Sequence, residues 1–148
     1  MILSDRDIKK EIAKGNISIE PFEESKLTPN GYDLTIDEIL LNEEKLQEAT
    51  IPPMTWFAIS TLEYIKLKGV AAQLWIRSSY ARKGVIASFG KVDAGFEGNL
   101  TIAAFNAKDE IYLKQGDTFC QIVFEKLSSE PLKYYNGKYK GQRGIKLE

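Results

Sequence analysis

The sequence predicts an all-β sandwich or barrel preceded by one helix. After residue 16, short apolar runs are separated by Pro, Gly, Asn and Asp, which is the spacing typical of antiparallel β-proteins. The runs are residues 33–36, 55–59, 64–67, 71–76, 100–105 and 118–124. A chain of 148 residues with 43% hydrophobic content can form a single core. We therefore expect one domain over residues 1–148.

The N-terminal segment carries the signals of a helix over residues 4–14. Ser4 is a suitable N-cap, acidic residues follow it in the first turn, and the apolar residues keep helical spacing. Gly15 ends the pattern. The first seven residues mix acidic and basic side chains, so we do not expect a signal peptide.

Two further segments are expected outside the strands. Residues 79–83 predict one short internal helix that Gly84 closes. Residues 134–148 are rich in Lys, Tyr and Gly and contain too little apolar material for a core strand. Terminal segments of this kind order poorly unless they are tied down. We expect a flexible C-terminal tail or lid.

The composition excludes several classes of chemistry. The chain has no histidine, which excludes Ser-His-Asp and Cys-His catalysis and every zinc site that needs histidine. A single cysteine, Cys120, excludes an internal disulfide and suits a reducing, cytoplasmic environment. The 20 basic and 21 acidic residues nearly cancel, so nucleic acid is not an expected partner. No apolar run is long enough to cross a membrane.

The segment 77–83 has the features of an anion site. Arg77 follows a predicted strand, and Ser78 and Ser79 stand where the short helix begins. Free backbone N–H groups at a helix start, with hydroxyls beside them, bind anions, and arginine can hold phosphate with two parallel hydrogen bonds. Arg82 and Lys83 add positive charge. The alternative is that a serine caps a surface helix and the cations are only solvated.

The segment 92–98 places one carboxylate in a glycine-flanked turn. It predicts a hairpin or bulge whose glycines let a ligand approach the backbone, so that main-chain groups could read a base. Asp93 would then polarise a water molecule. The alternative is an ordinary Asp-containing turn, and Phe96 is more typical of a core residue than of a stacking platform.

Together these segments resemble the superfamily of dUTPases and dCTP deaminases over nearly the whole chain. Five motifs occur in order, and the N-terminus is similar to the deaminase branch. The matching segments are Ile2-Leu3-Ser4-Asp5 with Pro21-Phe22, Pro29-Asn30-Gly31-Tyr32-Asp33-Leu34, Arg77-Ser78-Ser79-Tyr80-Ala81-Arg82, Val92-Asp93-Ala94-Gly95-Phe96-Glu97-Gly98, Gly116-Asp117-Thr118-Phe119-Cys120-Gln121, and the tail Lys138-Tyr139-Lys140-Gly141-Gln142-Arg143-Gly144.

The resemblance implies a distorted β-barrel or jelly-roll of the dUTPase type and a homotrimer whose active sites lie between neighbouring subunits. It implies that Asp93 orients the attacking water, and that Mg²⁺ is held by substrate phosphates and water. By position, the residues implied to bind the triphosphate are Arg77, Ser78, Ser79, Arg82, Gln121, Tyr139 and Gln142.

One departure from the family pattern bears on the reaction. Deaminases of this superfamily carry a proton-shuttling glutamate on the strand after the motif that here covers residues 92–98, and that position is Ala103 in this sequence. Glu97 or Glu110 would have to reach in from elsewhere. The tail also lacks the Gly-Phe-Gly ending of typical dUTPases. The leading interpretation is a dUTP pyrophosphatase; the alternatives are a dCTP deaminase, with or without hydrolysis, and a catalytically silent nucleotide-binding protein.

Overall fold

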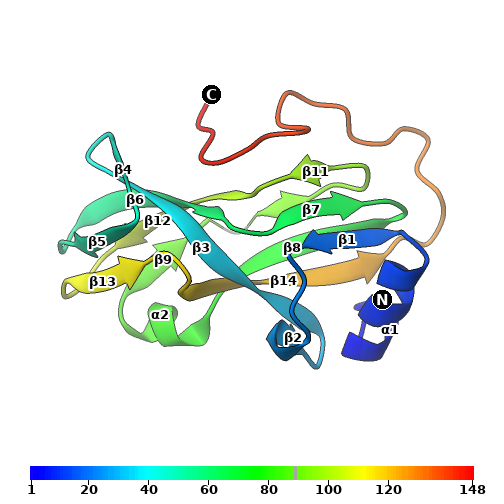
Figure 1. Cartoon of the computed structure of the whole chain (residues 1–148), viewed down its shortest axis with the longest axis horizontal. Coiled ribbons are helices and arrows are strands. Elements are labelled where there is room, and N and C mark those ends of the chain that lie inside the picture. Colours follow the sequence, from blue (N-terminus) through cyan, green and yellow to red (C-terminus); the bar gives the residue numbers. More distant parts are fainter. Residues whose placement is uncertain (89) are drawn as a thin grey trace.

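The computed structural model describes residues 1–88 and 90–148, and within them a curled nine-stranded sheet forms the body of the molecule (Figure 1). Seven strands lie side by side in it, and two short strands pair with β3. In sheet order they are β10 (Lys91–Val92), β8 (Val70–Ile76), β14 (Thr118–Lys126), β3 (Gly31–Leu41), β6 (Thr55–Thr61), β12 (Thr101–Asn106) and β9 (Val85–Ala87), with β2 (Leu27–Thr28) and β4 (Glu44–Leu46) on β3. This agrees with the predicted fold class.

The long strand β3 curls the sheet. Its first half pairs with β14 and its second half with β6, and the register with β6 shifts between Ile36 and Glu38. Such irregularities bend a strand and increase its twist. The inward side chains Leu34, Ile36 and Ile39 are completely buried along the bend. β3 therefore belongs to both sides of the core.

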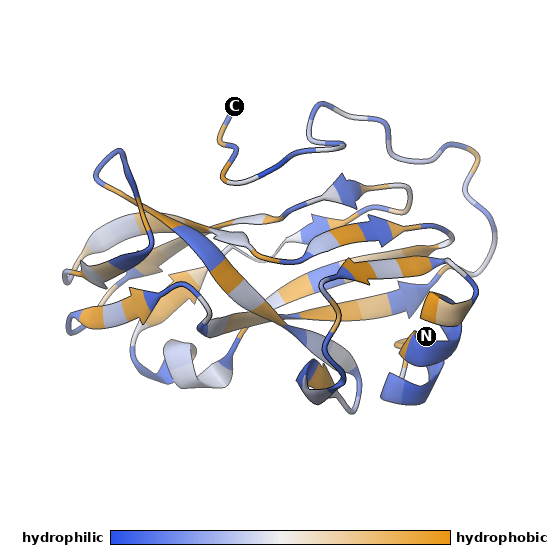
Figure 2. Ribbon diagram, in the orientation of Figure 1, coloured by the Kyte–Doolittle hydropathy of each residue, from blue (hydrophilic) through white to orange (hydrophobic). Residues whose placement is uncertain are grey.

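Two small antiparallel sheets complete the β-structure. The first contains β1 (Ile17–Glu20), β7 (Tyr64–Leu67) and β11 (Glu97–Gly98), and the second contains β5 (Glu48–Ile51) and β13 (Ile111–Lys114). Apolar residues alternate with polar ones along many strands (Figure 2). The core includes Cys120, whose burial raises the pKa of its thiol, so the thiol stays protonated.

The helices agree with the prediction to within one residue at each end. Helix α1 (Asp5–Ala13) begins after Ser4, whose side chain accepts a hydrogen bond from the Asp7 N–H. Helix α2 (Ser78–Arg82) begins one residue earlier than expected, and a 3₁₀ turn, η1, covers Glu24–Lys26. In the described part of the chain, no helix is long and apolar enough to cross a membrane.

All six predicted strands are present, and several short ones were not predicted. β10 and β11 have only two residues each, and β1 and β13 have four. A run this short carries little periodic signal. Its pairing depends on a partner far away in the sequence, as β1 depends on β7.

Candidate active site

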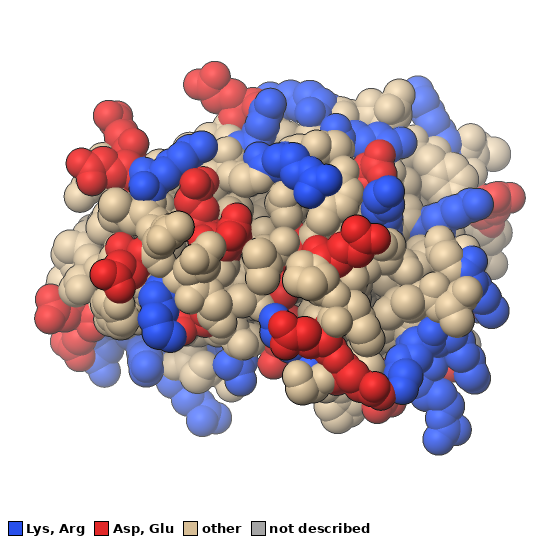
Figure 3. Space-filling view, in the orientation of Figure 1, with Lys and Arg blue, Asp and Glu red and all other residues tan. Residues whose placement is uncertain are grey.

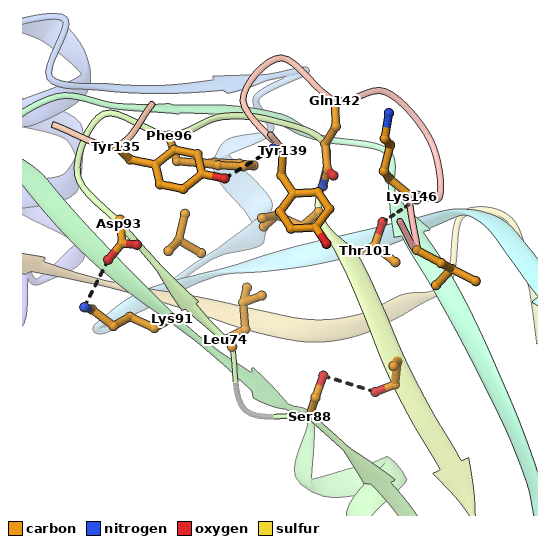
Figure 4. Close-up of a pocket in the computed structure, with 15 residues that line it drawn as sticks. Leu74, Ser88, Lys91, Asp93, Phe96, Thr101, Tyr135, Tyr139, Gln142 and Lys146 are labelled. Carbon is orange, nitrogen blue, oxygen red and sulfur yellow. Dashed lines mark hydrogen bonds and ion pairs between the residues drawn. The ribbon is translucent and has the colours of Figure 1, made fainter. Parts of the chain in front are cut away.

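A pocket of about 370 Å³ lies between the main sheet and the C-terminal tail (Figure 4). Three segments line most of it: residues 90–96, the start of β12, and the tail. The tail crosses above the sheet in Figure 1, so it forms the outer wall of the pocket. Three of the predicted site residues line this pocket, namely Asp93, Tyr139 and Gln142.

Asp93 stands at the start of a tight turn. The Phe96 N–H donates to the Asp93 carbonyl at 3.0 Å, which closes the turn. The Asp93 side chain is 51% exposed, and its carboxylate forms an ion pair with the Lys91 ammonium at 3.0 Å (Figure 4). The site therefore holds a carboxylate that water can reach, with a cation beside it.

Of the hairpin or bulge predicted at residues 92–95, the hairpin is wrong. The flanking strands do not pair with each other, because β10 pairs with β8 while β11 pairs with β7 in a different sheet. The turn connects two sheets. A glycine-flanked aspartate fits any tight turn, and the local sequence does not specify the partner of each flanking strand.

The close approach predicted at the glycines is made by the chain's own tail. Gly95 has φ +95°, and a Cβ there would lie 2.8 Å from the Tyr134 Cβ and 2.9 Å from the Tyr135 nitrogen. The Tyr135 N–H donates to the Ala94 carbonyl at 2.9 Å. Tyr135 also packs against Phe96, which is buried and has its ring centroid 5.8 Å from that of Tyr135. The tail is thus held directly against the turn that carries Asp93.

The two predicted tail residues point from the tail into the pocket (Figure 4). The Gln142 amide nitrogen donates to the Asn99 carbonyl at 2.5 Å, and its Oε1 is buried with no hydrogen-bond partner among the described residues. The Tyr139 N–H donates to the Tyr135 hydroxyl at 3.3 Å. Phosphate oxygens accept hydrogen bonds, so the phosphate-binding role predicted for Gln142 falls to the second N–H of its amide nitrogen, because the first donates to Asn99.

The other predicted phosphate ligands lie elsewhere in the chain. Arg77, Ser78, Ser79 and Arg82 are all exposed, and none lines the pocket. Arg77 is the N-cap of α2, and no side chain caps this helix, so the alternative of a capping serine is not what the structure shows. In Figure 1, α2 lies on the opposite side of the sheet from the tail.

Gln121 belongs to this second group. It lies on β14, opposite Trp75 of β8, and its amide nitrogen donates to the Asp33 carboxylate at 3.1 Å. β8 leads directly into α2, and Lys and Arg side chains gather along the edge of the molecule where α2 lies (Figure 3). One chain therefore presents two separate groups of predicted site residues.

Position 103 lies in the pocket and carries no ionisable group. Ala103 is on β12, and its carbonyl accepts a hydrogen bond from the Ser88 hydroxyl at 3.3 Å. Of the described residues that line the pocket, Asp93 is the one carboxylate. Glu97 forms an ion pair outside it, and Glu110 lines a different hollow beside α2. Among the described residues of one chain, no glutamate is therefore placed to move protons at position 103.

The described residues do not form a protein cage for a divalent cation. No group of three or more carboxylate, histidine or cysteine side chains comes together among them. The carboxylate of Asp93 already faces the ammonium of Lys91. A cation at this site would need most of its oxygen ligands from a bound molecule and from water.

Comparison with known proteins places this geometry in a family. A family model described as dCTP deaminase-like matches residues 2–48 and 38–127. A dCTP deaminase of Pyrococcus horikoshii is 43% identical over 149 residues, which is 95% of this chain and 92% of the relative. This chain belongs to the dCTP deaminase-like family.

Members of the dCTP deaminase-like family differ in the activity their names give. A relative from Sulfolobus islandicus rod-shaped virus 1, named as a probable deoxyuridine 5'-triphosphate nucleotidohydrolase, is 40% identical over 99% of this chain and 98% of its own length. The crystal structure of the deoxycytidine triphosphate deaminase of Agrobacterium tumefaciens superposes with a TM-score of 0.72 at 18% identity. That likeness covers 84% of this chain and 47% of the other, and it shows the shared fold.

Several pocket residues were not among the predicted ligands. Lys91, Thr101, Tyr135 and Lys146 all line the pocket. Tyr135 and Lys146 belong to the tail that was predicted to close over a ligand, and Lys91 stands two residues before Asp93. Alternation along a strand could have indicated Thr101, because it shares a face with position 103.

Proposed function

We propose that this member of the dCTP deaminase-like family is a dUTP pyrophosphatase, which converts dUTP to dUMP and pyrophosphate. The observation that carries the proposal is the pair Asp93 and Ala103. The described lining of the pocket has one carboxylate, which hydrolysis needs, and an alanine at the position where the family resemblance expects the deaminase glutamate. The viral relative named as a probable dUTP nucleotidohydrolase supports this assignment.

The proposed chemistry requires one base. A water molecule held by the Asp93 carboxylate attacks the α-phosphorus of dUTP, forming a new oxygen–phosphorus bond. The bond from the α-phosphorus to the bridging oxygen breaks, and pyrophosphate leaves with the bond electrons. The water proton passes to the carboxylate. The substrate would be the Mg²⁺ complex of dUTP, because the described residues supply no cage of their own for the ion.

The phosphates would be held by a second copy of the chain. We propose that α2 of a neighbouring subunit supplies the cations and hydroxyls, as expected of a homotrimer with active sites at its interfaces. This arrangement is supported by the separation of α2 from the pocket within one chain (Figure 1). An arginine that is exposed in one subunit can then contact a triphosphate bound to the next.

An apolar row on the outer face of the sheet supports such an assembly. Phe105 on β12 lies between Trp56 on β6 and Ile86 on β9 in the strand register. Trp56 and Ile86 are 49% and 61% exposed. Exposed apolar clusters mark interfaces. Because side chains alternate along β12, Phe105 and Ala103 share one face, so the row continues into the pocket.

Deamination of dCTP is the second candidate function. The Pyrococcus horikoshii relative named dCTP deaminase favours it. Glu110 also favours it, because this carboxylate lines a hollow together with Arg82, one of the proposed phosphate-binding residues. A neighbouring subunit that brings Arg82 to the pocket would bring Glu110 nearer as well.

Incubation of the purified protein with dUTP and with dCTP, followed by separation of the products, tests the proposal. We expect dUMP and pyrophosphate from dUTP, and neither ammonia nor dUTP from dCTP. Ammonia release from dCTP would establish the deaminase. Absence of any product together with measurable nucleotide binding would indicate a silent binding protein. An Asp93→Asn variant purified in the same way controls for contaminating host enzymes.

A further inference from the structure

The tail is docked on a short stretch of its own chain, at the end of β11 and the start of β12. Gly98 and Gln142 form a parallel bridge, and the Asn99 N–H donates to the Gln142 carbonyl at 3.0 Å. Nearby, the Lys146 N–H donates to the Thr101 hydroxyl at 2.9 Å. The side chain of Asn99 lies at the centre of these contacts, although it does not line the pocket.

Asn99 contacts two different parts of the molecule. Its amide nitrogen donates to the carbonyls of residues 61, 62 and 63 at 3.0, 3.3 and 3.1 Å. Only the NH₂ group can face three carbonyl oxygens, which fixes the orientation of the amide. The Oδ1 atom therefore faces the tail, where it accepts the Gly144 N–H at 3.4 Å. The side chain is a bridge between the β6–β7 turn and the tail.

The turn on the far side of this bridge is firmly held. Glu63 is completely buried, and its carboxylate accepts hydrogen bonds from the Thr35 N–H at 3.0 Å and the Thr35 hydroxyl at 2.7 Å. The Lys26 ammonium lies 3.5 Å from the same carboxylate. A buried carboxylate bonded in this way is costly to displace. Asn99 thus connects the tail to a fixed part of the core.

Gly98 leaves room for the tail beside Asn99. Its φ is +146°, and a Cβ there would lie 3.1 Å from three atoms of Gln142, including the backbone nitrogen and carbonyl oxygen. Any side chain at this position would strain the backbone and push the tail outward.

From these contacts we propose that Asn99 is a positioning residue, which holds the tail closed and thereby places Tyr139 and Gln142 in the pocket. The inference rests on the proposed function in one respect, that the pocket binds a nucleotide. Loss of Asn99 would leave the fold intact and shift the tail toward an open position. A substrate that binds only the closed form then binds with an apparent affinity reduced by the fraction of closed tails.

The test compares Asn99→Ala with the matched control Thr61→Val. The Thr61 hydroxyl donates to the Glu63 carbonyl and accepts the Leu100 N–H, so this variant loosens the same turn without touching the tail. Trypsin reports on the tail directly, because its cleavage sites include Lys138, Lys140, Arg143 and Lys146. Cleavage is followed by mass spectrometry well below each variant's melting temperature.

We expect Asn99→Ala to be cleaved in the tail about three- to ten-fold faster than the wild type, the range that one lost hydrogen bond implies. The KM for dUTP should rise by a similar factor with kcat almost unchanged, since saturating substrate closes the tail again. Thr61→Val should melt earlier and keep wild-type tail cleavage.

A lower melting temperature for Asn99→Ala with wild-type tail cleavage would overturn the inference and leave Asn99 a structural residue. Tail cleavage without nucleotide does not depend on activity. A wild type that neither hydrolyses dUTP nor deaminates dCTP would therefore refute the proposed function and still leave the role of Asn99 open to measurement.

Discussion

The pocket under the tail and the exposed surface of α2 differ in how they hold the predicted site residues. The tail covers the pocket and is held by backbone hydrogen bonds to Ala94 and Asn99 beside it. On the α2 surface, by contrast, Arg77, Ser78 and Arg82 are exposed. A covered pocket restricts the orientation of a bound molecule, whereas exposed cations do not.

Under the proposed function, one chain alone would hold an incomplete site, because the pocket and the α2 cations lie apart. Exposed cations are solvated at no cost to the fold. In the proposed assembly they would be available to bind the triphosphate of a nucleotide held by a neighbouring subunit. The carboxylate needs the opposite environment, a pocket that limits where its water can lie. The apolar row of Trp56, Ile86 and Phe105 offers the surface through which the two halves could meet.

The largest expected effect is at the pocket. Asp93→Asn should lower kcat for dUTP hydrolysis by about a thousand-fold, because the amide keeps the shape of the side chain but cannot accept the proton of water. The affinity for dUTP should stay close to that of the wild type. Calorimetric titration with a non-hydrolysable dUTP analogue, together with pyrophosphate release, measures both. Normal turnover in this variant would remove Asp93 from the mechanism.

Removal of the pocket wall should have the next largest effect. A chain that ends at residue 133 should fold and associate normally but turn over dUTP about a hundred-fold more slowly, since Tyr139 and Gln142 no longer enclose the substrate. Size-exclusion chromatography and circular dichroism check the fold. An unfolded or monomeric product would mean that the tail is structural and that the lid interpretation fails.

A smaller effect is expected on the α2 side. Arg77→Ala should weaken dUTP binding by about ten-fold through the loss of one charge-assisted contact, with the melting temperature nearly unchanged because Arg77 is exposed. Lys68→Ala, which removes an exposed cation from the turn between β7 and β8, is the matched control. Equal dUTP affinities for both variants would place the phosphates elsewhere.

The sequence predicted the parts of this molecule that local patterns encode. The cap at Ser4, the six predicted strands and the helix near Ser78 are set by neighbours along the chain. The strand partners around Asp93 belong to β7 and β8, which lie well before it in the sequence. The docking of the tail on Asn99 joins residues more than forty positions apart. No local pattern encoded either feature, nor did any indicate that the glycines at residues 92–98 accommodate the tail.

The candidate site residues were predicted one by one. Their order along the sequence did not indicate that they form two separate groups in space. Gln121 and Asp93 both belong to motifs that contain glycines, yet Gln121 lies on β14 and Asp93 lies in the turn after β10. Their separation is visible only in the three-dimensional structure. The register of β8 with β14 places Gln121 opposite Trp75, and the tail lies against the turn that carries Asp93. The family resemblance predicted a site shared between subunits, and the separation within one chain is compatible with that arrangement.

Mixing two impaired variants tests the shared site most directly. One subunit carries Asp93→Asn, the other carries Arg77→Ala with Arg82→Ala, and hydrolysis is measured at a dUTP concentration well below the KM of the arginine variant. After joint dissociation and reassembly in equal amounts, about a quarter of the interfaces should combine an intact pocket with an intact α2, so about a quarter of wild-type dUTP hydrolysis should return. Each variant reassembled alone should stay far below that level. A mixture no more active than the sum of its parents, despite hybrid oligomers seen by native mass spectrometry, would contradict a site shared between subunits.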